Sequence, residues 1–119
     1  MLVPTDFYVD PRDPKRALVV FSGFHGGHVF KTTDGGQSWR DLSANLPDTP
    51  ANAVVVDERT DKLYVGTDIG VFSLERDEKR WALASRNLPT TVVMDLLIDY
   101  EAGAIIAATH GRGMWAADL

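Results

Sequence analysis

Residues 53–74 read AVVVDERTDKLYVGTDIGVFSL, in which three short apolar runs alternate with two polar turns. The runs cover residues 53–56, 63–67 and 71–74. They are too short for helices and rich in β-branched and aromatic residues, so they predict strands. The turns between them carry Asp and Gly, which favour chain reversal. A fourth strand is expected to begin at Trp81. This stretch therefore predicts an antiparallel meander of four short strands.

The same pattern recurs along the chain at a fixed offset. Trp81 follows Trp39 by 42 residues, and Asp99 follows Asp57 by 42. The tripeptide Asn-Leu-Pro occurs at residues 45–47 and again, 42 residues later, at 87–89. An earlier copy aligns Asp10 with Asp57 at an offset of 47, and the five additional residues fit an insertion at residues 11–15. Repeats of about 40 to 50 residues built from strands are typical of propeller blades.

We therefore expect an all-β chain that forms one domain, residues 1–119, made of about three four-stranded blades. The copies cover about residues 6–47, 48–89 and 90–119, and the last one ends before a fourth strand. A propeller typically has four to eight blades, so three blades make a partial propeller.

Composition excludes several classes of protein. The 119 residues carry a formal net charge of −5, which argues against a nucleic-acid partner because phosphate neutralisation needs a positive surface. There is no Cys, so disulfides and thiolate metal sites are excluded. No apolar run approaches the ~20 residues that cross a bilayer, so no membrane partner is expected. No phosphate loop or dinucleotide fingerprint is present, and no cofactor is expected.

One eight-residue motif lies where the third strand of the first copy reverses into the fourth. Residues 32–39, TTDGGQSW, match the pattern Ser/Thr-x-Asp-x-Gly-x-Ser/Thr-Trp. An Asp carboxylate accepts hydrogen bonds from nearby backbone N–H groups, Gly supplies a positive φ, and Trp packs against the turn. We expect a structural role for the residues of this box, which are Thr32, Asp34, Gly36, Ser38 and Trp39.

This motif resembles the Asp-box, or BNR repeat, of sialidases, xyloglucanases, sortilin-type receptors and photosystem assembly factors. Residues 66–72 (GTDIGVF) and 108–115 (ATHGRGMW) resemble the C-terminal blades of bacterial proteins in this group. The resemblance implies a β-propeller in which the box is a structural turn on the face opposite the usual ligand site. The second copy departs from the box, because Asp77 and Trp81 stand one residue closer together and no Gly lies between them.

The opposite rim carries the candidate ligand-binding residues. It comprises the turns between second and third strands and the links between blades, and in propellers that resemble this chain it binds ligands. A glycan or a protein loop is the expected ligand. The alternative is that these residues occur at this rim only because they favour turns. A metal site built from the three His residues is not expected, because their spacing is loose. The candidates are His25, His28, Asp68, His110 and Arg112.

A glycoside hydrolase is the alternative function. It requires two carboxyl groups ~5 to 9.5 Å apart across a cleft. The Asp residues that close the first strands, Asp10, Asp57 and Asp99, are expected at the wrong rim, and Asp68 has no evident partner. Asp95 lies in the first strand of the third copy, where it either faces the central channel or simply occupies one of the alternating positions of the strand. A binding or scaffolding module is therefore favoured over an enzyme, and an engineered or fragmentary propeller without activity is a further alternative.

Three blades leave an uncovered blade face at each end of the stack. Such surfaces recruit partners, and closed two-fold dimers are the commonest soluble oligomers. We therefore expect a homodimer that forms a six-bladed ring. Residues 1–4 align with residues 44–47, the tail of a fourth strand, and are expected to complete the third blade of the neighbouring copy.

Overall fold

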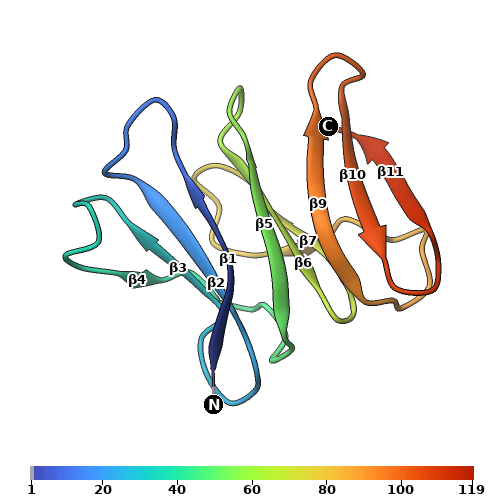
Figure 1. The fold of residues 1–119 in the computed structure, drawn as a ribbon, viewed down its shortest axis with the longest axis horizontal. Helices are drawn as coiled ribbons and strands as arrows, with labels where there is room; N and C mark the ends of the chain where they lie inside the picture. Colours follow the sequence, from blue (N-terminus) through green and yellow to red (C-terminus); the bar gives the residue numbers. More distant parts are fainter. Residues whose placement is uncertain (1) are drawn as a thin grey trace.

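The computed structural model describes residues 2–119 and builds them into three antiparallel sheets (Figure 1). The first blade consists of β1 (Val3–Val9), β2 (Ala17–Ser22), β3 (Val29–Thr32) and β4 (Arg40–Asp41). The second consists of β5 (Ala51–Asp57), β6 (Lys62–Thr67), β7 (Gly70–Leu74) and β8 (Ala82–Leu83). The third consists of β9 (Val93–Asp99), β10 (Ala104–Thr109) and β11 (Met114–Asp118). The predicted all-β meanders are confirmed.

The strands of each blade follow one another in chain order, so every connection within a blade is a hairpin. The fourth strands β4 and β8 have only two residues each, and the third blade has three strands in the described part of the chain. The first strands lie side by side, β1 against β5 and β5 against β9, and the sheets fan out from them (Figure 1). None of residues 2–119 belongs to a helix that could cross a membrane.

The core lies between the blades, because each blade buries one face against its neighbour. Between the first and second blades, Val20 and Val29 pack with Val65 and Phe72. Between the second and third blades, the buried residues are Ala53, Tyr64, Val71, Val93, Leu96, Ile105, Ala107 and Trp115. The second blade is covered on both faces, and all five residues of β7 are buried.

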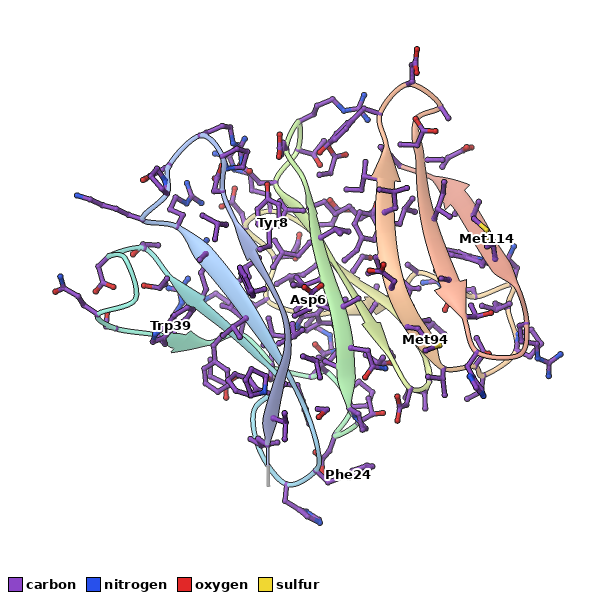
Figure 2. All side chains as sticks on the ribbon, viewed as in Figure 1. Asp6, Tyr8, Phe24, Trp39, Met94 and Met114 are labelled. Carbon is purple, nitrogen blue, oxygen red and sulfur yellow. The ribbon has the colours of Figure 1, made fainter. Side chains whose placement is uncertain are left out.

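The outer faces of the end blades are apolar and open. On the first blade, Phe7 is 70% exposed, and a shallow hollow is lined by Phe7, Val19, Phe21, Phe30 and Trp39. On the third blade, Leu97 and Met114 are 61% and 74% exposed. Figure 2 shows Trp39 and Met114 at opposite sides of the molecule. The two open faces are thus the two ends of one stack.

The N-terminal residues do not have the place that the sequence alignment predicts. Val3 pairs with Ser22 and Pro4 with Phe21, so both residues already belong to β1 of their own blade. The prediction that they complete the third blade of a neighbour is therefore wrong for these two residues, and Met1 lies outside the described residues. The alignment failed because the chain passes directly from residue 3 into a first strand, whereas after residue 47 a link precedes β5.

Candidate ligand-binding rim

The connections between strands divide into two rims. The turns β2–β3, β6–β7 and β10–β11 lie at one end of the molecule, the lower end in Figure 1, and the turns β1–β2, β5–β6 and β9–β10 lie at the other. All five candidate residues lie in the first set of turns, which we call the candidate rim. His25 and His28 belong to the β2–β3 loop, Asp68 to the β6–β7 turn, and His110 and Arg112 to the β10–β11 turn.

Asp68 and His110 occupy equivalent places in neighbouring blades. The Asp68 N–H donates to the carbonyl of Pro50 (3.1 Å), and the His110 N–H donates to that of Val92 (2.9 Å), so both turns are tied to the link that precedes the first strand. The preceding residue is Thr in both blades. Thr67 Oγ1 donates to the carbonyl of Gly70, and Thr109 Oγ1 donates to that of Gly113. Asp68 and His110 are therefore held at corresponding points of the rim.

Ser22 is the residue that sequence reasoning missed. It pairs with Val3 at the end of β2 and so stands at the place that Asp68 and His110 take in the other blades. Its Oγ donates to the carbonyl of Val3 over 3.5 Å. The offset of 42 that links Asp68 to His110 was visible in the sequence. Ser22 could not be found in this way, because the β2–β3 loop is longer than the other two turns.

His28 does not face the rim. It is 1% exposed, its Nδ1 lies 3.1 Å from the carbonyl oxygen of Phe21, and its Nε2 lies 2.8 Å from Oδ1 of Asp48. Asp48 also accepts the His25 N–H. The hydrogen bond with His28, and then that from His25, lower the pKa of the Asp48 carboxyl. His28 thus joins the β2–β3 loop to the link between blades, and this arrangement supports a structural role.

His25, Phe24 and Arg112 are exposed at the rim. The His25 side chain is 93% exposed, and its backbone has a φ of 64° in the left-handed region, which His tolerates better than most residues. Phe24 is 56% exposed and lies at the lower tip of the molecule in Figure 2. Arg112 is exposed between Gly111 and Gly113, which have φ values of 82° and 70°.

A metal centre gains no support from this geometry. Among residues 2–119 no three His, Asp or Glu side chains come together in a group that could hold a metal ion. The alternative that His25, His28 and His110 form such a centre is weakened further, because both ring nitrogens of His28 already face oxygen atoms of the protein.

The box at residues 32–39 folds as a turn between β3 and β4, and the Gly35 N–H donates to the carbonyl of Lys15 in the β1–β2 turn (3.0 Å). Asp34 accepts hydrogen bonds from the Ser38 N–H and hydroxyl and from the Thr32 hydroxyl. These bonds, that from the Ser38 hydroxyl foremost, lower the pKa of Asp34 to about 2. Gly36 has a φ of 91°, and the Trp39 Nε1–H donates to its carbonyl (3.1 Å). The Trp39 ring is nevertheless 46% exposed, because it lies at the open face of the first blade.

The opposite rim holds the blades together through charged side chains. Arg12, in the β1–β2 turn, donates to Asp10 and, across the blade boundary, to Asp61 (2.8 Å) and the carbonyl of Glu58. The hydrogen bond from Arg12 lowers the pKa of both carboxyl groups. These contacts use Asp10 within the protein, which agrees with its interpretation as a turn former.

Comparison with known proteins identifies the fold. No family model matches the chain, and no curated protein matches it. Among solved structures, a GH74 enzyme from Niastella koreensis superposes with a TM-score of 0.72 at 17% identity over 92% of the chain. The extracellular domain of a hybrid two-component system from B. thetaiotaomicron superposes with a TM-score of 0.70 at 16% identity over 97% of the chain.

Both structural neighbours are much longer than this chain, which spans 19% of the first and 15% of the second. At such identities the likeness concerns the fold alone. Membership of the Asp-box family therefore remains a resemblance carried by residues 32–39. What the superpositions establish, together with the three stacked meanders, is that the chain consists of β-propeller blades and is a partial propeller.

Proposed function

We propose that the chain is a binding module whose ligand, a glycan or a protein loop, contacts the candidate rim. The observation that carries this proposal is the row formed by Ser22, Asp68 and His110, one residue from each blade at the same structural position. A row of this kind offers a hydroxyl and an imidazole, which can donate and accept hydrogen bonds, and a carboxylate, which accepts them.

The surroundings of the row favour a glycan. Arg112 adds a cationic donor at the end of the third blade, and Phe24 adds an exposed aromatic ring at the first. Sugar rings offer hydroxyl groups to polar side chains and an apolar C–H face to an aromatic ring. The overall charge of −5 disfavours a strongly acidic ligand.

A glycan array tests this proposal. We expect the wild-type chain to retain a defined set of oligosaccharides and the variant H110A/R112A to lose them without a change in melting temperature, since both side chains are exposed. The matched control is Asp34→Ala, which should lower the melting temperature and leave binding intact, because the box lies away from the rim. Loss of binding in the Asp34 variant alone would place the site elsewhere. Binding to a peptide library but to no oligosaccharide would favour the protein loop.

A glycoside hydrolase is the second candidate, and the structural likeness to a GH74 enzyme is the observation that favours it. The geometry adds little, because the Asp68 carboxylate accepts a hydrogen bond from Asn52 (2.9 Å) and the Asp48 carboxylate is engaged by His28. A panel of chromogenic glycosides, with Asp68→Asn as the control, tests for hydrolysis. Turnover that this substitution abolishes would favour the enzyme over the binding module.

A closed propeller ring needs more blades than the three present here. Closure by a second copy, the homodimer expected from the sequence, remains a prediction. In such a homodimer, the open face of the third blade of one copy would pack on the open face of the first blade of the other copy. Light scattering at micromolar concentration measures the mass that decides it.

A further inference from the structure

The first strands of neighbouring blades are joined by side chains that lie at repeated positions. Thr5 Oγ1 donates to the carbonyl of Ala51 (2.6 Å), and Asn52 Nδ2 donates to the carbonyl of Val93 (3.0 Å). In the third blade the equivalent residue is Met94, which is 56% exposed and has no polar hydrogen to donate. The third blade therefore lacks this link to a following blade.

The next position along the strand supplies a second kind of link. Asp6 follows an irregularity in the pairing of β1, and its Oδ2 accepts the N–H of Val54 from the second blade (3.1 Å) while its Oδ1 accepts the N–H of Phe7 (2.9 Å). Figure 2 shows Asp6 between β1 and β5. The residue before Val54 is Ala53, which has no carboxylate to bond the Val54 N–H as Asp6 bonds that of Phe7, so this N–H is left for Asp6 of the first blade.

Asp95 is the counterpart of Asp6 in the third blade. The two residues pair with Val20 and Ala108, which in turn pair with Val29 and Met114, so that each stands in the same cross-strand row of its blade. Asp95 Oδ1 accepts the N–H of Leu96 (2.9 Å), as Asp6 Oδ1 accepts that of Phe7. The difference is that Asp95 is exposed, because no blade covers its face.

We propose that Asp95 is a blade-docking residue that accepts a backbone N–H through Oδ2 from the first strand of a further blade. That blade carries a small uncharged residue at the position that Ala53 occupies in the second blade. This inference goes beyond the proposed function, because it concerns the pairing of blades and not the candidate rim. Leu97, Ile106 and Met114 supply the apolar part of the same docking face.

The chain's own first blade satisfies the apolar part of this requirement and fails the polar part. Its outward row Phe7–Val19–Phe30 corresponds to the row Val54–Val65–Phe72, with which the second blade receives the first. The N–H of Phe7, however, is already bonded to Asp6. Closure by a second copy would bring the carboxylate of Asp95 to that of Asp6 without a free N–H between them. Like charges repel, so closure by a second copy is weaker than docking of a blade with a small uncharged residue at the position of Asp6.

The substitution Asp6→Ala tests the proposal, because it turns the first blade into a partner with a small residue and a free Phe7 N–H. Sedimentation equilibrium at pH 7 measures the dissociation constant of self-association. We expect Asp6→Ala to lower it about ten- to hundredfold relative to the wild type, as one hydrogen bond to a charged group implies. The matched variant D6A/D95A lacks the hydrogen bond that Asp95 would accept and should associate less tightly than D6A. Equal association of D6A and D6A/D95A would overturn the role of Asp95.

A second variant keeps the test sharp if Asp6→Ala unfolds through loss of the Val54 contact. Asp95→Asn is exposed, retains the acceptor for Leu96, and offers an amide donor to the Asp6 carboxylate of another copy. The Asp95→Asn variant should associate more tightly than the wild type. The Asp95→Ala variant, which has no amide donor, should associate less tightly than Asp95→Asn. Equal association of Asp95→Asn and wild type would overturn the proposal. The readout is mass, so failure here leaves ligand binding at the candidate rim untouched.

Discussion

The substitution Asn45→Ala should destabilise the chain by removing a link between the first two blades. Asn45 is the Asn of the first Asn-Leu-Pro repeat. Its Oδ1 accepts the N–H of Trp81 (2.7 Å), and its Nδ2 donates to the carbonyl of Trp81 (3.0 Å). The amide therefore satisfies both backbone groups of a residue that is only 5% exposed.

The magnitude follows from the number of hydrogen bonds. Each intramolecular hydrogen bond contributes about 0.5 to 1.5 kcal/mol to the free energy of unfolding. Two bonds give about 1 to 3 kcal/mol, and we expect about 1 to 2 kcal/mol because Asn45 is exposed enough for water to replace part of the loss. In a domain of this size that corresponds to a fall of roughly 4 to 10 °C in melting temperature.

Asn87→Ala is the matched control within the same chain. Asn87 is the Asn of the second repeat, but its Oδ1 accepts a single bond, from the Trp115 Nε1–H (3.0 Å). Urea unfolding followed by Trp fluorescence should show about half the loss for Asn87→Ala that Asn45→Ala shows. Equal losses in the two variants, or an Asn45→Ala midpoint equal to that of the wild type, would refute the reasoning from hydrogen-bond count.

Three further predictions concern the box and the blade contacts. Asp34→Ala should lower the melting temperature at pH 6 more than at pH 2.5. The pKa of Asp34 in the folded chain is about 2, below the ordinary Asp value, so its carboxylate stabilises the fold above pH ~4 and loses this effect as the pH falls towards 2. Thermal unfolding followed by circular dichroism at both pH values measures the difference. Gly66→Ala should cost about 1 to 3 kcal/mol, because its Cβ would lie 2.5 Å from Val93 Cγ1, and a Val93→Ala partner should restore part of the loss in urea titrations. Tyr100→Phe should cost about 1 kcal/mol in calorimetry, since its hydroxyl accepts the N–H of Glu58 (2.9 Å), and an unchanged melting temperature would contradict the value assigned to this contact.

The repeat explains why so much of the fold could be predicted. An offset shared by Trp, Asp and Asn-Leu-Pro reports a structural unit, and the apolar runs inside one unit locate its strands. The box also behaves as its residue types predict, because the side-chain hydrogen bonds within it are all local. Local chemistry of this kind can be recognised without knowledge of distant contacts.

The rest depended on contacts that no local pattern contains. His28 belongs to a loop without periodicity, and its ring is hydrogen-bonded to Asp48, which lies 20 residues further along the chain. The pairing irregularity between Pro4 and Asp6 shifts the alternation of β1, so the side chains that face the second blade could not be read from period two. For the same reason Asp95 could be placed in its strand but not assigned to a face.

The position of the second blade, covered on both sides, has a consequence for native-state hydrogen exchange. Each blade contacts only its neighbours, so the stack resembles a one-dimensional array in which end units can open alone. Opening of the third blade exposes the amides of β11, whereas β6 and β7 lie in the middle of the stack with most of their residues buried. Amides of β6 and β7 should therefore exchange only when the whole chain unfolds, and amides of β11 through sub-global opening of lower free energy.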